Sequence, residues 1–194
     1  MVTLIAGTNR SNSKTAEIAA YYQKELFAQH GIESCLLDLA SLPPEFISGH
    51  MYGKGPKHPS YHALMDTLAG TTHSVWLFPE YNNSFPGVMK SFLDSFPFPN
   101  PLKGTAAAMV GISAGTNGGA NGMSHLADIL SYLGVSVLPQ RLRIYSIMEN
   151  WKDGEITQPM LRSIMAEQQA ALAASILATV QHRAAPLVMN GDRS

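Results

Sequence analysis

The polar segment Glu80-Tyr81-Asn82-Asn83-Ser84, which includes one aromatic residue, lies between two prolines, Pro79 and Pro86. The apolar run before them is typical of a strand, which Pro79 is expected to end because it lacks a backbone donor. Pro86 suits the first position of a helix, where the missing N–H costs nothing. The segment offers backbone groups, a flat phenol ring and short polar side chains. That combination suits a flat, heteroaromatic ligand with polar edges.

A second polar segment, residues 7–15, follows the strand-like run 2–6 and leads into a helix. A helix N-terminus with exposed N–H groups and nearby hydroxyls can bind an anion. The segment lacks the GxxxxGK[ST] and GxGxxG patterns, but a lone phosphomonoester requires neither. A simple helix cap by Ser11 or Ser13 is the alternative. The candidate phosphate-binding residues are Thr8, Arg10, Ser13, Lys14 and Thr15.

A third segment, residues 113–119, combines hydroxyl groups with three glycines. Gly115, Gly118 and Gly119 permit backbone conformations and close approach that side chains would block. Ser113 adds a hydroxyl at the start of the segment. We expect a second polar wall of the same ligand site here, with a plain flexible loop as the alternative.

Alternating strand and helix patterns must position these three segments. Apolar runs without polar alternation predict strands of a parallel sheet that is covered on both faces. Five such strands fit the flavodoxin-like order 2-1-3-4-5, in which the loops after strands one, three and four open at one edge. The expected strands are 2–6, 33–38, 74–78, 105–112 and a short 135–138. The expected helices are 15–29, 59 or 61 to 68, 86–94, 123–133 and 160–180.

The chain is expected to form one domain over residues 1–182, with a loose tail at 183–194. Two internal segments, 42–57 and 139–159, are predicted to be irregular. His50, His58 and His62 lie in or beside the first of them. A metal site there is the less favoured alternative, because no cysteine or carboxylate cluster accompanies these histidines.

Composition excludes several classes of protein. The 194 residues carry a formal net charge of −1 at pH 7, which gives no indication of nucleic acid or a membrane surface as partner. No apolar run approaches the about 20 residues needed to span a bilayer. A single cysteine, Cys35, excludes an internal disulfide and is expected to be a small core residue. No secretory leader pattern precedes the first strand, so a cytoplasmic protein is expected.

One pattern consists of Pro79-Glu80-Tyr81-Asn82, followed by Ser84, Pro86-Gly87, Lys90 and Asp94. This pattern resembles a loop of the NADPH-dependent FMN reductase family. Residues 7–15 and 113–119 resemble two further loops of that family. The resemblance implies that residues 7–15 hold the FMN phosphate. It also implies that residues 79–82 run along the flavin ring, with Asn82 in contact with the ring. Residues 113–119 would then lie beside the pyrimidine end of the flavin. The chain departs from the family after the paired glycines, where Ala120-Asn121-Gly122 replaces a frequent arginine.

The resemblance implies an FMN-dependent NAD(P)H oxidoreductase that passes a hydride through FMN to a flavin, quinone, azo or nitro compound, or metal ion. No catalytic side chain is expected, because the cofactor carries the chemistry. Family members assemble as homodimers or homotetramers through the helices that begin here at Pro86 and near Met123, where Phe92, Phe96 and Phe98 offer apolar contact. The alternatives are a flavodoxin-like electron carrier without NAD(P)H activity and an interaction domain that no longer binds flavin.

Overall fold

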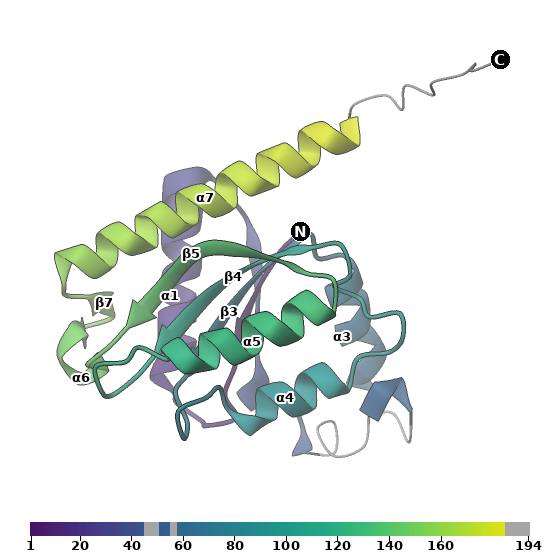
Figure 1. The fold of residues 1–194 in the computed structure, drawn as a ribbon, viewed down its shortest axis with the longest axis horizontal. Coiled ribbons are helices and arrows are strands. Elements are labelled where there is room, and N and C mark those ends of the chain that lie inside the picture. The colour runs from purple at the N-terminus through teal and green to yellow at the C-terminus, as the bar shows by residue number, and fades with distance from the viewer. Residues whose placement is uncertain (45–50, 55–57, 185–194) are drawn as a thin grey trace.

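The computed structural model describes residues 1–44, 51–54 and 58–184. A five-stranded parallel sheet forms its centre, in the order β2-β1-β3-β4-β5 (Figure 1). The predicted flavodoxin-like order is therefore confirmed. The strands are β1 (Val2–Ala6), β2 (Ser34–Asp38), β3 (His73–Pro79), β4 (Ala106–Ile112) and β5 (Ser136–Ile144).

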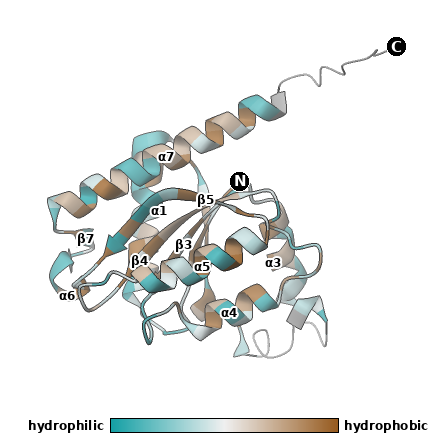
Figure 2. Cartoon of the chain, in the orientation of Figure 1, coloured by the Kyte–Doolittle hydropathy of each residue, from teal (hydrophilic) through white to brown (hydrophobic). Residues whose placement is uncertain are grey.

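Helices cover both faces of the sheet, and two apolar clusters fill the space between the layers. One face packs against α1 (Lys14–His30) and α7 (Pro159–Ala184). The other packs against α3 (Ser60–Ala69), α4 (Gly87–Asp94) and α5 (Ala120–Tyr132). Figure 2 shows the apolar central strands between these layers. Shorter elements are η1 (Leu39–Ser41), η2 (Met51–Gly53), α6 (Ile147–Asn150), β6 (Trp151–Lys152) and β7 (Glu155–Ile156).

The residues of β3 illustrate why the central strands contain almost no polar alternation. Val75 and Leu77 belong to the cluster under α1 and α7, whereas Trp76 and Phe78 belong to the cluster under α4 and α5. Successive side chains of a strand point to opposite faces, and both faces here are covered. A continuous apolar run is therefore what this position in the sheet requires.

Helix boundaries follow local signals. Ser13 caps α1, and its Oγ accepts a hydrogen bond of 3.2 Å from the backbone N–H of Ala16. The helix ends before Gly31, which adopts a left-handed φ of 65°. In contrast, α5 begins at Ala120, three residues before the predicted start at Met123, because Gly119 already turns the chain into the helix.

The fifth strand differs most from the prediction. Residues 136–138 of the expected strand 135–138 form the first third of β5, which continues through Pro139 to Ile144. The pairing of β4 with β5 shifts register between Ala107 and Met109, and an edge strand with such an irregularity tolerates proline. Gln168 on α7 supports this stretch, since its Nε2 donates to the carbonyl oxygens of Met109 (2.9 Å) and Gln140 (2.8 Å).

Replacing Gln168 with alanine is expected to lower the free energy of unfolding by about 2 kcal/mol, because two strand carbonyls would lose their buried donor. Gln181→Ala, which shortens an exposed glutamine of the same helix, is the matched control. Urea unfolding followed by circular dichroism measures both values. Equal stabilities of the two variants would contradict this account of β5.

The segment after β5 was predicted to be irregular, but it contains α6 and the β6–β7 hairpin. Trp151 anchors the hairpin to α1: its indole Nε1 donates to Glu17 Oε2 at 3.0 Å, and its ring meets Tyr21 edge-on at 5.4 Å. The elements are only a few residues long, so they left no periodic pattern in the sequence.

Other expectations concern the ends and edges of the fold. The final helix continues to Ala184, and the rest of the predicted tail and His50 lie outside the described residues. Cys35 lies on the edge strand β2 and is half-buried, not part of the core. Within the described residues, no helix is long and apolar enough to cross a membrane. The same part of the chain contains no group of three His, Cys, Asp or Glu placed to hold a metal.

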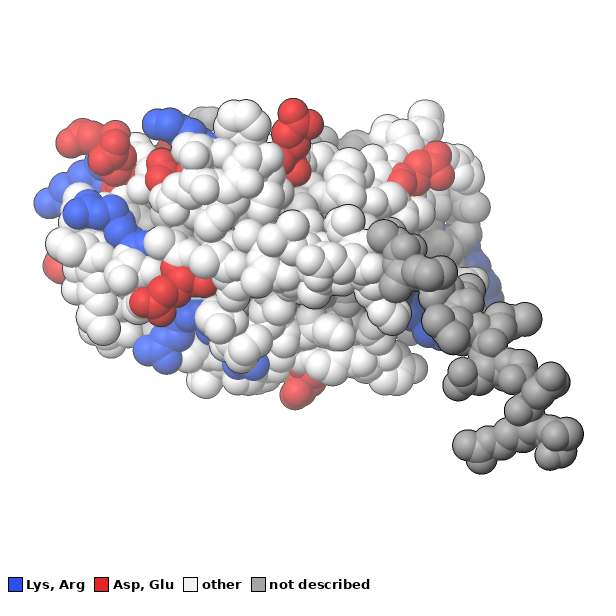
Figure 3. Space-filling model, turned by 90° about the horizontal axis from the view of Figure 1, so that it is seen from above, with Lys and Arg blue, Asp and Glu red and all other residues white. Residues whose placement is uncertain are grey.

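Acidic and basic side chains are interspersed on the face that Figure 3 shows, and much of that surface is uncharged.

Candidate cofactor site

The loops that follow β1, β3 and β4 meet at the carboxyl edge of the sheet and enclose a cavity of about 380 Å³, here called the loop cavity. Eight of the predicted site residues line it: Arg10, Ser13, Lys14, Thr15, Pro79, Glu80, Tyr81 and Ser113. Asn12, Ile112, Ala114, Ile147 and Met148 complete the lining. The structure thus brings together three loops whose residues lie as far apart along the chain as Arg10 and Ser113.

One end of the loop cavity is built to receive an anion. Lys14 and Thr15 are the first residues of α1, where backbone N–H groups have no acceptor within the helix. Arg10 and Lys14 add two positive side chains, and neither forms an ion pair within the described part of the chain. A helix N-terminus together with two cations favours a negatively charged group such as a phosphate.

Thr8 does not line the loop cavity but connects two of its walls. The residue is fully buried, and its Oγ1 lies 3.1 Å from the hydroxyl of Tyr81. The same oxygen accepts a hydrogen bond of 3.3 Å from the backbone N–H of Arg10. Thr8 therefore fixes the loop after β1 against the loop after β3.

The loop after β3 is a tight two-residue turn. The backbone groups of Tyr81 and Ser84 exchange two hydrogen bonds of 2.9 and 3.0 Å around Asn82 and Asn83. Both asparagines adopt positive φ values, 48° and 63°, as a type I′ turn requires. Asn82 lies at the tip of this turn and is absent from the cavity lining. Its residue type is explained by the turn itself.

Two further hydrogen bonds attach this turn to α5. Asn121 Nδ2 donates to Asn83 Oδ1 at 2.9 Å, and Ser84 Oγ lies 2.9 Å from His125 Nδ1. Asn121, one of the three residues that follow the paired glycines, therefore supports the turn.

Glu80 connects the loop after β3 with the glycine-rich loop after β4. Its backbone N–H donates to the carbonyl of Ile112 at 2.7 Å. Its Oε2 accepts hydrogen bonds from the backbone N–H of Gly119 (3.0 Å) and from Asn117 Nδ2 (3.3 Å). Since Thr8 joins the other pair of loops, all three are held in one fixed arrangement.

The glycine-rich loop is shaped by its own hydrogen bonds. Ser113 Oγ donates to the carbonyl of Gly115 (2.7 Å) and accepts from the N–H of Gly118 (2.8 Å). Gly118 and Gly119 have φ values of 61° and 73°, so the predicted need for glycine conformations is met there. A Cβ on Gly118 would lie 2.7 Å from Arg143 Cβ, so this glycine is packed against β5. Gly115 has open space around it, and none of the three glycines lines the loop cavity.

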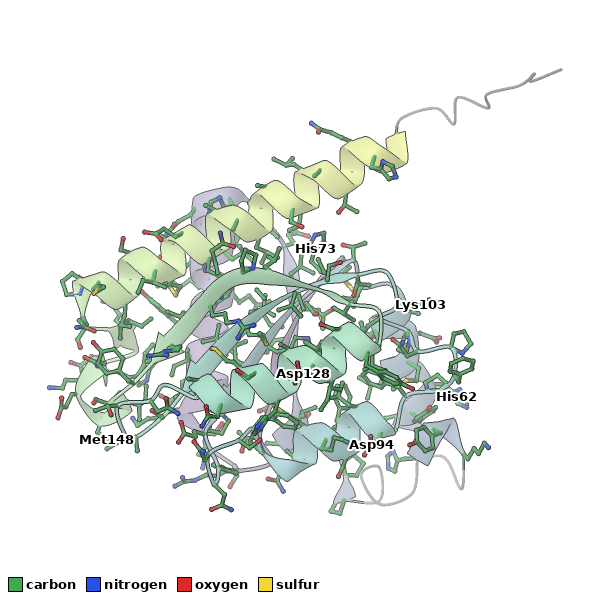
Figure 4. All side chains as sticks on the ribbon, in the orientation of Figure 1. His62, His73, Asp94, Lys103, Asp128 and Met148 are labelled. Atoms are coloured by element: carbon green, nitrogen blue, oxygen red, sulfur yellow. The ribbon has the colours of Figure 1, made fainter. Side chains whose placement is uncertain are left out.

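One apolar wall of the loop cavity was not predicted from the sequence. Ile147 and Met148 of α6 line the loop cavity, and Met148 is 68% exposed at its rim. Backbone N–H groups of Ser146 and Ile147 donate to the carbonyls of Gly115 (2.8 Å) and Ser113 (3.1 Å), which brings α6 to the site. Figure 4 shows Met148 at the end of the molecule opposite Asp94 and Lys103.

The residues present fit a phosphorylated, flat ligand. Cations and free helix N–H groups line one end, Pro79 and Tyr81 form a wall, and Ser113 and Glu80 supply polar groups. The fold and this arrangement define a flavodoxin-like α/β protein whose cavity lies where such sheets bind their ligands.

A family model for NADPH-dependent FMN reductase matches residues 1–146, and the chain belongs to that family of flavin-dependent oxidoreductases. The chain is 28% identical over 172 residues to an NAD(P)H-dependent FMN reductase of Pseudomonas aeruginosa. That match covers 87% of this chain and 90% of the relative.

The chain is also similar to one relative over part of its length and to one solved structure over most of it. A 2-hydroxy-1,4-benzoquinone reductase of a Burkholderia species is 40% identical over 81 residues, which is 40% of this chain and 44% of the relative. The solved structure of the flavoenzyme NAD(P)H:(acceptor) oxidoreductase from Paracoccus denitrificans superposes with a TM-score of 0.72 at 22% identity. That match covers 91% of this chain and 97% of the other, and it supports the fold.

Proposed function

We propose that this protein is an FMN-dependent NAD(P)H oxidoreductase that delivers a hydride, through FMN, to a small acceptor such as a flavin, a quinone, an azo or nitro compound, or a metal ion. The main support is the loop cavity, in which an anion-binding end and a flat polar wall are held together by hydrogen bonds among three loops. The family and the names of the two curated relatives point to the same reaction class.

In this proposal, FMN supplies the hydride-transfer chemistry when bound. Arg10, Lys14 and the first N–H groups of α1 hold its phosphate, with Ser13 and Thr15 beside them. Pro79 and Tyr81 orient the ring, and Ser113 meets its polar edge. No side chain is assigned as a general acid or base.

Five predicted residues have a supporting role in this proposal. Thr8, Gly118 and Gly119 hold the loops through hydrogen bonds or backbone geometry. Gly115 accepts the hydrogen bond that attaches α6. Asn82 forms the turn after Tyr81, from which its backbone is proposed to approach the flavin.

Steady-state oxidation of NADPH and NADH by the FMN-loaded protein, with 1,4-benzoquinone as acceptor, tests the function. We expect turnover that depends on both FMN and acceptor. FMN binding without NAD(P)H oxidation would instead support the alternative of an electron carrier. The protein without added FMN is the control for direct reaction between nicotinamide and quinone.

We also propose that two copies associate through α4 and α5. A groove of about 690 Å³, here called the α4–α5 groove, lies between the C-terminal halves of these helices and residues 96–103. Asp94, Lys103 and Asp128 are labelled around it in Figure 4. Opposite charges beside apolar side chains allow the same surface to complement itself across a two-fold axis.

The three phenylalanines expected at this interface lie in different places. Phe92 is fully buried, so its expected contact with a partner is wrong, and Phe96 forms part of the groove floor. Phe98 is 97% exposed, and Tyr132, which also lines the groove, is 90% exposed. Exposed aromatic side chains beside an apolar groove are typical of a covered interface.

Phe98→Glu combined with Tyr132→Glu is expected to convert a homodimer or homotetramer into smaller species, because charges would be buried without partners. Phe27→Glu on α1, an exposed aromatic away from the groove, is the matched control. Light scattering at micromolar concentration gives the molecular mass. A monomeric wild-type protein would contradict the proposal.

A further inference from the structure

The two carboxylate oxygens of Glu80 have different surroundings. Oε2 accepts two hydrogen bonds, from the Gly119 backbone and the Asn117 side chain. Oε1 forms none with the described residues, and no lysine, arginine or histidine among them makes an ion pair with the carboxylate. Oε2 therefore has a structural role, and the carboxylate, whose charge both oxygens share, has no ion-pair partner among the described residues.

The backbone keeps this charge at the wall of the loop cavity. The backbone N–H of Glu80 donates a hydrogen bond to the carbonyl oxygen of Ile112 at the end of β4. Its neighbours Pro79 and Tyr81 also line the loop cavity. Because Oε2 is tied to Gly119, the side chain cannot rotate away without breaking the contact between the two loops. The residues after Gly119 are Ala120, Asn121 and Gly122, so this part of the loop supplies no cation.

We propose that Glu80 is a positioning residue with two separable roles. Through Oε2 it fixes the glycine-rich loop against the loop after β3. Through its charge, which has no ion-pair partner among the described residues, it disfavours the more electron-rich, reduced form of a bound flavin, and so lowers the flavin's reduction potential. The second role rests on the proposed function, whereas the first concerns the protein alone.

Three substitutions separate the roles. Glu80→Gln keeps a carbonyl oxygen that can accept from both Gly119 and Asn117 but removes the charge. Asn117→Ala removes one of the two donors and keeps the charge. Glu80→Ala removes the charge and both hydrogen bonds.

The measurements are the dissociation constant of oxidised FMN and the midpoint potential of the bound flavin, by reduction against a reference dye. For Glu80→Gln we expect affinity for oxidised FMN within about threefold of wild type. We expect reduced FMN to bind about tenfold more tightly, which raises a two-electron potential by about 30 mV. Asn117→Ala should weaken FMN binding without changing the potential, and Glu80→Ala should weaken it further, by about tenfold or more.

An unchanged potential in Glu80→Gln, with FMN bound normally, would overturn the charge role and leave the proposed function intact. Equal losses of FMN affinity in Glu80→Gln and Glu80→Ala would overturn the separation of the roles. Failure of the wild type to bind FMN would overturn the proposed function and the charge role together. Thermal unfolding without flavin tests the loop role by itself: Glu80→Ala must unfold at a lower temperature than Glu80→Gln, and equal temperatures would refute it.

Discussion

Replacing Ser13 with aspartate is expected to weaken FMN binding about 100-fold, a loss of about 3 kcal/mol, while the protein remains folded. Aspartate caps a helix as well as serine does, so the hydrogen bond to the N–H of Ala16 is retained. The new carboxylate would lie at the anion-binding end of the loop cavity, beside Lys14 and Thr15. Its charge would repel the phosphate. Fluorescence titration with FMN measures the loss.

Two controls identify the phosphate as the group that is repelled. Ser13→Asn keeps a capping side chain without charge and should bind FMN within about tenfold of wild type. Riboflavin lacks the phosphate, so the aspartate variant and the wild type should bind it equally. A similar loss of affinity for riboflavin and FMN would show that the first loop does not hold the phosphate.

Gly111→Ala is expected to lower the free energy of unfolding by about 3 kcal/mol, because the added methyl group has no space. A Cβ at this position of β4 would overlap the carbonyl oxygen of Gly118 and lie 3.0 Å from Met123 Cε. The glycine-rich loop folds back directly over the strand at this point. Relief of the overlap requires the loop to move, so FMN affinity should fall as well.

Gly115→Ala is the matched control for this substitution. It makes the same change four residues later, where nothing lies within 4 Å of the added Cβ and φ is not left-handed. Its stability should equal that of the wild type within about 0.5 kcal/mol in urea unfolding. Similar stabilities for both variants would contradict the close packing of the loop on β4.

The sheet could be predicted from the sequence because β1, β3 and β4 are buried on both faces, which makes their residues continuously apolar. The part of β5 from Pro139 to Ile144 could not be predicted from the sequence. It is an edge strand in which Arg141 and Arg143 are exposed, and Pro139 reads as the end of a strand. The register shift and the hydrogen bonds from Gln168, which accommodate this proline in the sheet, depend on tertiary contacts.

The candidate site was predictable where residue type and loop position agree, as for Arg10, Pro79 and Ser113. Thr8 and Gly118 were assigned to the ligand, but the structure shows contacts of both with other parts of the protein. Met148 was missed because an isolated methionine carries no spacing signal, and its place depends on how α6 follows β5. The family resemblance identified the loops, and the contacts show how each is held.

Titration of the purified wild-type protein with FMN, followed by visible absorption and flavin fluorescence, tests the central claim most directly. The account predicts a spectral change that saturates at about one FMN per chain with micromolar affinity or better. It also predicts competition by FMN analogues that keep the phosphate. Absence of saturation at about 100 µM FMN would contradict the claim that the loop cavity binds this cofactor.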